Sequence, residues 1–301
     1  ADDGGLFIPK SLHKVDINEL RGLDYNDLAK KVIYPFIGDF MTGTDLDKII
    51  DQSYSVFRKK NVVDLIKVGD RSVLELFHGP TFAFKDVAMQ LLAALLDKAA
   101  EKTDKKIIVL GATSGDTGSA AIEACKKFKD IDIAILFPHQ KISPVQQRQM
   151  TTSNAKNVFP LAVKGDFDDC QALVKALFND LEFRDEVNLS AVNSINWARL
   201  MPQIVYYFSS ALALGAPDRT VAFSVPTGNF GNVFAGYAAA QMGLPIERLI
   251  VASNQNDILT RFFEAGRMAR ETVLPSLSPS MDIQVSSNFE RQLFESSGRD
   301  S

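Results

Sequence analysis

The sequence alternates short runs of apolar, often β-branched residues with segments of helical periodicity, and this alternation constrains the fold more than any other feature. Residues 107–110 and 220–225 are two such runs, and each leads through a glycine-rich turn into a helical pattern. Strands that alternate with helices in this way build parallel sheets from βαβ units. We therefore predict an α/β protein of two domains, with mainly parallel sheets flanked by helices.

Other segments extend this pattern. Residues 131–137, 158–163 and 249–252 predict further strands. The clearest helix is predicted over residues 86–102, where Asp86 is a candidate N-cap and apolar residues follow the spacing of one helical face. The remaining predicted helices are 119–128, one starting near Asp168, 197–214 with Pro202 inside it, 233–242 closed by Gly243, and a short one ending near Phe263.

The composition excludes several classes of protein. Of the 301 residues, 46% are hydrophobic and 23% are charged, which is typical of a globular protein of about two domains. A net charge of −4, from 33 Lys and Arg against 37 Asp and Glu, lacks the basic excess of a nucleic-acid-binding protein. No apolar run reaches the length of a membrane span. We expect a small-molecule partner and neither a nucleic acid nor a membrane.

Cysteine and histidine spacing argues against disulfides and metal sites. Cys125 and Cys170 are far apart and form no CxxC motif, which favours a reducing compartment, the cytoplasm. His13, His78 and His139 have no HxxxH or HExxH spacing, so we expect no metal site. For His78 we expect no more than a local hydrogen-bonding role.

The two glycine-rich turns are candidate anion sites. A helix N-terminus presents unpaired N–H groups, and glycines let the backbone close around an anion. The first turn, with Gly111, Gly115 and Gly118, has neither the GxGxxG spacing nor the GK[ST] ending of the common nucleotide-binding motifs. The alternative for each turn is a purely structural one, a tight passage from strand to helix.

Lys85 stands at the start of the predicted helix 86–102, between aromatic residues in the segment HGPTFAFKD at residues 78–86. A cation at a helix N-terminus is unfavourable by about 0.3–1 kcal/mol unless a partner compensates it. Aromatic neighbours and the helix dipole lower the pKa of an amine, as a lysine that forms a Schiff base requires. The alternative is a surface lysine whose stem packs on the helix.

Six segments of the chain, in one order, carry a resemblance to a known family. They are DGGLFIP near the N-terminus, HGPTFAFKD at 78–86, ATSGDTGSA at 112–120, KISPVQ at 141–146, NSINWARL at 193–200 and PTGNFGN at 226–232. Together they resemble the bacterial and fungal branch of the threonine synthase family, which uses pyridoxal 5′-phosphate. The resemblance covers nearly the whole chain.

The resemblance implies the fold of the tryptophan synthase β subunit, pyridoxal-phosphate fold type II, with the cofactor between two α/β domains. Residues 1–86 and 200–301 would form the large cofactor-binding domain with an N-terminal extension. Residues 87–199 would form the smaller domain, which carries the substrate loop. Lys85 would hold the cofactor as a Schiff base, and its phosphate would be bound by Gly228, Asn229, Phe230, Gly231 and Asn232.

The resemblance also implies substrate contacts. The residues expected against the substrate's carboxylate are Ser114, Gly115, Asp116, Thr117 and Gly118. Those expected near the cofactor or the substrate's phosphate are Asn193, Ser194, Asn196, Arg199 and Lys141. For the segment NSIN the alternative is a turn and N-cap of the next helix, and for Lys141 and Arg199 it is surface charge.

The implied reaction is the conversion of O-phospho-L-homoserine and water to L-threonine and phosphate, the last step of threonine biosynthesis, by a lyase. A phospholyase of the same superfamily would instead give an oxo acid and phosphate, and a non-catalytic remnant would only bind an anion. The oligomeric state stays open, and a monomer is compatible with the sequence.

The end of the sequence departs from the family pattern. In the family the chain continues well past the position of Ser301 and carries a small-residue motif whose hydroxyl contacts the cofactor's pyridine nitrogen. No such motif follows Gln284. We therefore expect the C-terminal part of the family fold to be missing from this sequence, and the absence of an initial methionine agrees with that.

Overall fold

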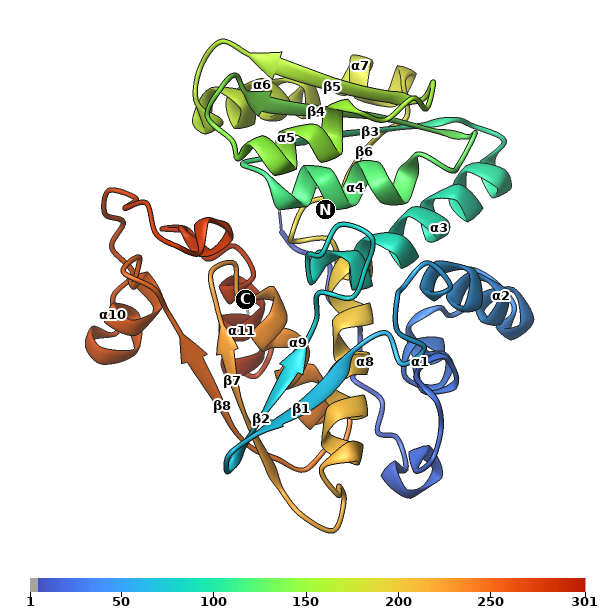
Figure 1. Ribbon diagram of the computed structural model, residues 1–301, viewed down its shortest axis with the longest axis vertical. Helices are drawn as coiled ribbons and strands as arrows, with labels where there is room; N and C mark the ends of the chain where they lie inside the picture. The colour runs from blue at the N-terminus through green and yellow to red at the C-terminus, as the bar shows by residue number, and fades with distance from the viewer. Residues whose placement is uncertain (1–4, 301) are drawn as a thin grey trace. The chain divides into compact units, whose positions relative to one another are not determined.

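The computed structural model describes residues 5–300, so the first two residues of DGGLFIP lie outside the described part. The chain forms two compact units (Figure 1). Unit 1 comprises Ala1–Leu46, Leu65–Leu74 and Ser194–Ser301, and unit 2 comprises Asp47–Asp64 and Glu75–Asn193. The division into 1–86 with 200–301 and 87–199 comes from the family resemblance and stays a prediction.

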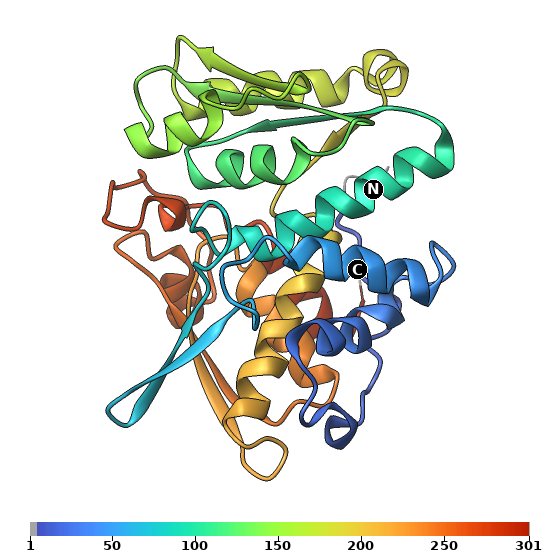
Figure 2. The same ribbon diagram turned by 45° about the vertical axis from the view of Figure 1, so that its right-hand side comes forward.

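Unit 2 is built on a four-stranded parallel sheet in the order β5-β4-β3-β6. Its strands are β3 (Ile107–Ala112), β4 (Ile131–Pro138), β5 (Val158–Val163) and β6 (Leu189–Ala191). Helices α3 (Lys85–Thr103), α4 (Asp116–Cys125) and α5 (Pro144–Thr151) lie on one face, and α6 (Phe167–Asn179) and α7 (Leu181–Glu186) on the other (Figures 1 and 2).

The side-chain alternation of β4 explains this two-sided cover. Leu136 packs with Cys170 and Val174 of α6. Its neighbour Ile135 points to the opposite face, toward Gly118 of α4. A strand buried on both faces by helices is mostly apolar, as residues 133–137 are, and Asp132 near the start of the strand pairs with Lys106. Both cysteines are free and buried, and burial raises the pKa of the Cys125 thiol to about 12, so that it stays protonated at neutral pH.

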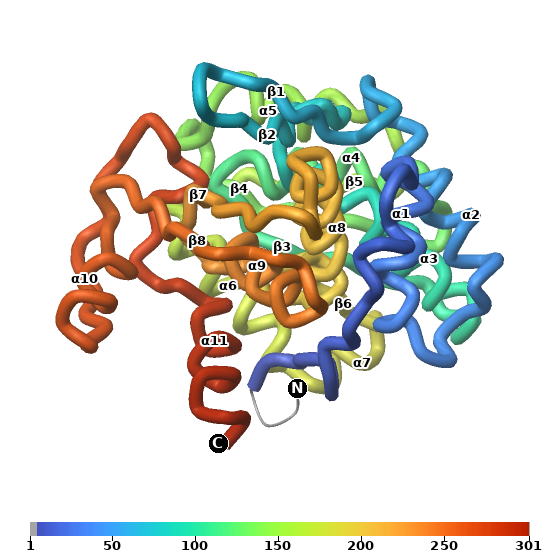
Figure 3. The backbone as a smooth tube through the Cα atoms, turned by 90° about the horizontal axis from the view of Figure 1, so that it is seen from below, coloured from blue at the N-terminus to red at the C-terminus, as the bar shows by residue number. Residues whose placement is uncertain are grey.

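Unit 1 contains a parallel pair of strands, β7 (Val221–Pro226) and β8 (Ile246–Ala252). Helix α9 (Gly231–Gln241) packs on β8 and on α8 (Trp197–Ala213), while α1 (Tyr25–Ile33) and α11 (Phe289–Ser296) extend the cover (Figure 3). Gly236 permits this packing, because a Cβ there would lie 2.9 Å from side-chain atoms of both Leu249 and Tyr207. The core therefore has no room for a larger residue at this helix crossing.

Helix α10 (Ile258–Ala265) is the predicted short helix that ends near Phe263. The elements that were not predicted are the 3-10 turns Ile17–Leu20, Tyr34–Phe36 and Pro279–Met281, the helix α2 (Gly43–Tyr54), the hairpin of β1 (Asp64–Val68) and β2 (Arg71–Glu75), and α1, α5, α7, α11 and β6. No helix within residues 5–300 is long and apolar enough to cross a membrane.

The predicted strands and helices are confirmed, including α8 with Pro202 inside it and Gly243 just beyond the end of α9. Several boundaries were wrong. Helix α4 spans Asp116–Cys125 instead of 119–128, α9 begins at Gly231 instead of 233, and β8 begins at Ile246 instead of 249. Both helices have a glycine in the first turn, and because glycine is a poor helix former the sequence did not indicate that these residues are helical. Gly118 is needed there because a Cβ would lie 2.5 Å from Thr113 Cγ2 and 2.8 Å from Met150 Sδ.

Asn157 offers a test of how unit 2 is held together. Its side-chain amide donates to the carbonyls of Phe128 and Ile131, both at 2.8 Å, and lies 3.2 Å from that of Cys125. We predict that Asn157→Ala lowers the free energy of unfolding by about 1–3 kcal/mol, because buried carbonyls lose their donor. Urea unfolding measures this. The exposed Asn154→Ala is the control, and equal effects of the two variants would contradict the assignment.

Candidate active site

Lys85 is the first residue of α3 and is buried, with 8% of its surface exposed. Its Nζ donates to Asp116 Oδ2 at 2.6 Å and lies 4.4 Å from the centre of the Phe84 ring. The unfavourable position of a cation at a helix start is thus compensated by a carboxylate. The surface-lysine alternative does not describe this buried ion pair.

The segment before Lys85 folds around Asp86. The Asp86 carboxylate is fully buried and accepts hydrogen bonds from Thr81 N at 2.8 Å and Thr81 Oγ1 at 2.7 Å. Burial raises the pKa of Asp86, and the hydrogen bonds from Thr81 oppose that rise. Gly79 allows the close turn, since a Cβ there would lie 2.4 Å from Asp86 Cβ.

Asp86 is therefore not the N-cap of its helix, as the sequence had indicated. The N-cap of α3 is Phe84, which makes no side-chain capping bond. Lys85 also contacts fewer aromatic rings than expected. Phe82 is exposed and stacks under the Arg58 guanidinium at 3.7 Å, so Phe84 is the one of the two flanking phenylalanines that contacts the lysine nitrogen.

The first glycine-rich turn is organised by Thr113. Its buried hydroxyl accepts hydrogen bonds from the N–H groups of Gly115, at 3.0 Å, and Gly118, at 2.9 Å. Gly115 has a φ of +154°, a backbone conformation that residues with a side chain rarely adopt, and a Cβ there would lie 2.0 Å from Gln146 Oε1. Asp116 follows in the first turn of α4, where the helix dipole favours a carboxylate.

The other predicted residues of unit 2 lie around this turn or apart from it. Ser114 is exposed and Thr117 is partly buried in the first turn of α4. Lys141 is exposed in the connection between β4 and α5, and Asn193 is exposed at the end of the unit. The structure thus joins Lys85 directly to Asp116.

The second glycine-rich turn, in unit 1, connects β7 to α9. The carbonyl of Gly228 accepts from Ser286 Oγ at 2.7 Å, and that of Asn229 from Asn288 N at 3.0 Å. Phe230 is the N-cap of α9 in the left-handed conformation, with φ +62°, and no side chain caps the helix. The carbonyls are therefore held by the protein, while the helix start retains the unpaired N–H groups that bind anions.

Asn232 has a different role from its neighbours in this turn. Its side-chain oxygen accepts from the hydroxyls of Tyr206 and Tyr207, the latter at 3.0 Å. Burial raises the pKa of both tyrosines, so both hydroxyls remain donors at neutral pH. The Asn232 side chain therefore anchors α9 to α8.

The predicted residues around 194–199 are also placed in unit 1. Asn196 is the N-cap of α8 and accepts from Ala198 N at 2.9 Å, as the structural alternative for NSIN foresaw. Arg199 is buried in the first turn of that helix, and the Ser194 carbonyl accepts from Asn288 Nδ2 at 3.1 Å. Their roles toward a cofactor or substrate stay predictions.

Comparison with known proteins agrees with these motifs. Residues 73–300 match the family model described as pyridoxal-phosphate dependent enzyme, and residues 1–54 match that of the threonine synthase N terminus. The chain is 54% identical to threonine synthase of Pseudomonas aeruginosa over 99% of its own length and 65% of that protein's.

Solved structures give the same result. Pyridoxal-phosphate-bound threonine synthase from Brucella melitensis is 55% identical, with a TM-score of 0.96 over 99% of this chain and 65% of that one. Threonine synthase from Escherichia coli is 36% identical, with a TM-score of 0.87 over the whole of this chain and 70% of that one. The chain belongs to the threonine synthase family of pyridoxal-phosphate-dependent enzymes.

The expected fold is thereby confirmed, and the chain spans about two thirds of the length of these threonine synthases. Its residues fit the family's cofactor on two counts. Unit 2 holds a buried lysine, the residue type that binds pyridoxal phosphate covalently, and unit 1 holds a helix N-terminus without a side-chain cap, which suits a phosphate.

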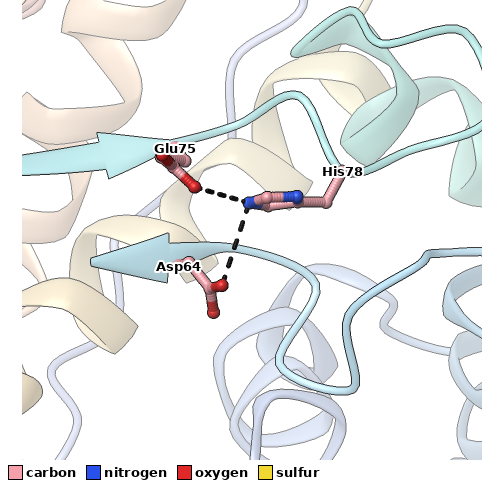
Figure 4. Close-up of side chains that lie close together, drawn as sticks. All are labelled: Asp64, Glu75 and His78. Atoms are coloured by element: carbon pink, nitrogen blue, oxygen red, sulfur yellow. Dashed lines mark hydrogen bonds and ion pairs between the residues drawn. The ribbon is translucent and has the colours of Figure 1, made fainter. Parts of the chain in front are cut away.

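One cluster of side chains that could bind a metal ion was not predicted from the sequence, because its members are separated along the chain. His78 Nε2 lies 3.0 Å from Glu75 Oε2 and 4.0 Å from Asp64 Oδ2 (Figure 4). The three side chains offer ligand atoms within 4.8 Å of one another, so the spacing rule for histidines was too narrow to judge metal binding. Lys59 Nζ already lies 2.9 Å from Asp64 Oδ2 and supplies a positive charge to the cluster.

Thr113 and the segment 286–291 were also missed as organisers of the two turns. Thr113 lies inside the motif ATSGDTGSA but was given no role of its own. We predict that Thr113→Val lowers the thermal midpoint of unfolding, because the N–H groups of Gly115 and Gly118 lose their acceptor in a site of unchanged volume. Thr113→Ser keeps the hydroxyl and serves as the control. Equal midpoints for the two variants would show that the hydroxyl does not organise the turn.

Proposed function

We propose that this protein converts O-phospho-L-homoserine and water to L-threonine and phosphate with pyridoxal 5′-phosphate, as the last step of threonine biosynthesis. Its membership of the threonine synthase family supports the substrate. The observation that carries the proposal for this chain is the buried ion pair of Lys85 with Asp116, at 2.6 Å. We place the reaction in the cytoplasm, with no nucleic-acid or membrane partner.

Lys85 is the proposed covalent attachment point of the cofactor. Pyridoxal phosphate, once bound, supplies an electron sink for charge that develops on the substrate's carbon atoms. Lys85 reacts as a neutral amine, and the carboxylate nearest to its nitrogen, Asp116, can accept the proton that the ammonium loses. When the substrate's amine replaces it, the freed Lys85 can remove the α hydrogen and return protons at the neighbouring carbons.

The turn 228–232 is the proposed phosphate site for the cofactor. Gly228, Asn229, Phe230, Gly231 and Asn232 contribute backbone N–H groups at the start of α9, where the helix dipole favours an anion. The Asn232 side chain is engaged by two tyrosines, so its contribution is expected from the backbone alone.

The turn at the start of α4 is the proposed site for the substrate's carboxylate. Ser114 and Thr117 carry hydroxyl donors, and the N–H groups of Gly115 and Asp116 lie at a helix N-terminus. The Asp116 side chain would repel a second carboxylate, so we assign it to Lys85 and assign only its backbone to the substrate. For the substrate's phosphate we keep Asn193, Ser194, Asn196, Arg199 and Lys141.

The experiment that tests the reaction is a product analysis. Full-length protein supplied with pyridoxal phosphate and O-phosphohomoserine should release threonine and phosphate in equal amounts, and Lys85→Ala should abolish turnover. Release of phosphate without threonine would contradict the proposal and support the phospholyase. The relatives described above are threonine synthases and do not support that alternative. Binding without any turnover would support a non-catalytic remnant.

A second experiment tests the role of Asp116. An opposite charge at 2.6 Å favours the ammonium form of Lys85, whereas attachment of the cofactor requires the neutral amine. We predict that Asp116→Asn keeps the cofactor to a lower pH than the wild type, yet turns over more slowly. The absorbance of bound cofactor between about pH 5 and 9 measures this.

The exposed Asp168→Asn in the same unit is the matched control and should follow the wild type. If Asp116→Asn and the wild type lose the cofactor at the same pH, Asp116 does not hold the Lys85 proton.

A further inference from the structure

Residues 286–291, with the sequence SSNFER, form a segment of unit 1 that we call the bracket. The side chains of Ser286, Asn288, Phe289 and Arg291 are buried, although most of them are polar. Buried polar groups are retained where they are hydrogen-bonded, and here most of the bonds go to backbone carbonyls of distant segments. Neither the periodicity nor the family motifs pointed to these residues.

The bracket first binds the turn that precedes α9. Ser286 Oγ donates to the Gly228 carbonyl at 2.7 Å, and Asn288 N donates to the Asn229 carbonyl at 3.0 Å. Ser287 Oγ adds a bond to Asn229 Oδ1 at 3.1 Å. Because the C=O and N–H of one trans peptide point in opposite directions, holding these two carbonyls turns the N–H groups of Asn229 and Phe230 away from the bracket.

Phe289 supports the strained residue of the same turn. Phe230 has a φ of +62°, a conformation that a bulky residue adopts only when its surroundings enforce it. Its ring packs edge-on against Phe289, with centroids 5.0 Å apart, and both rings are buried. The packing holds the first residue before α9 in the conformation that starts the helix.

Asn288 and Arg291 then connect the turn to other parts of unit 1. Asn288 Nδ2 donates to the Ser194 carbonyl at 3.1 Å, and its Oδ1 accepts from Arg291. The Arg291 guanidinium also donates to the carbonyl of Ile195 at 2.6 Å and to that of Phe7 at 2.7 and 3.0 Å. Burial lowers the pKa of Arg291 to about 10, so it is charged at neutral pH. Within residues 5–300 it forms no ion pair with a carboxylate.

We propose that Ser286, Asn288 and Arg291 are positioning residues that aim the N–H groups of the turn 228–232 at the phosphate of the cofactor. The inference rests on the proposed function, because it takes that turn as the phosphate site. The inference goes beyond the proposed function because it attributes part of the affinity for the phosphate to side chains that do not touch the ligand. Arg291 is joined to the turn through Asn288, and its positive charge adds to the potential of the helix start.

The test compares two ligands that differ only in the phosphate, pyridoxal 5′-phosphate and pyridoxal, by absorbance titration of the full-length protein. We expect Ser286→Ala, which removes a bond to the turn itself, to weaken binding of pyridoxal phosphate about tenfold. Asn288→Ala keeps the backbone bond to Asn229 and removes only the side-chain bonds that hold residue 288, so we expect about threefold, with binding of pyridoxal changed less than about twofold in both variants. Arg291→Lys, which keeps the charge but not the fork of donors, should weaken the phosphate-bearing ligand as well. A general loss of structure would weaken both ligands equally.

Two matched variants control for the loss of a bond elsewhere in unit 1. Ser210 is a buried serine whose hydroxyl donates to the Tyr206 carbonyl at 2.7 Å, and Arg299 donates to the Pro9 carbonyl at 3.2 Å. Ser210→Ala and Arg299→Lys should leave the ratio of the two dissociation constants unchanged.

Equal weakening of both ligands by Ser286→Ala and Asn288→Ala, or no weakening of either, would overturn the inference. The failure of the proposed function is seen separately, in the wild type. If the unaltered protein does not bind pyridoxal phosphate more tightly than pyridoxal, the turn is not a phosphate site. The proposed phosphate site and the positioning role of Ser286, Asn288 and Arg291 are then both wrong.

Discussion

The ion pair between Lys85 and Asp116 is the interaction on which the proposed chemistry of unit 2 depends. Both residues stand in the first turn of a helix, α3 and α4, and both side chains are largely buried. A buried charge is costly unless it is paired, so each residue requires the other. The helix dipole stabilises the Asp116 carboxylate and destabilises the Lys85 ammonium, so the carboxylate is what keeps a cation at the start of α3. This arrangement gives a lysine that can become a nucleophile without leaving the protein interior.

Unit 1 uses the same plan of strand, turn and helix for a different purpose. At α4 the first turn carries its own carboxylate, whereas α9 begins without a side-chain cap. The protein instead occupies the carbonyl side of the turn, through Ser286 and the backbone of Asn288, and leaves the N–H side for a ligand. An anion can therefore be bound with a net charge of −4 on the whole chain, because the attraction is local.

Periodicity made most of the fold predictable, since the strands contain short apolar runs and α3 has an unbroken apolar face. Helix starts at glycines were less predictable, because Gly118 and Gly231 are poor helix formers whose positions are decided by close packing. The bracket and Thr113 were not foreseen as organisers, because a side chain that bonds a distant backbone leaves no spacing in the sequence. The cluster of Asp64, Glu75 and His78 was missed because its members are separated along the chain. What the motifs supplied was the identity of Lys85 and of the turn 228–232.

The most direct test of the central claim is to find the residue that holds the cofactor. The full-length protein is incubated with pyridoxal phosphate, reduced with borohydride and digested, and the labelled peptide is identified by mass spectrometry. The account predicts the label on Lys85, in the peptide that contains FAFKD, and its loss in Lys85→Ala. A label on another lysine such as Lys141, or no label at all on protein that binds the cofactor, would contradict it.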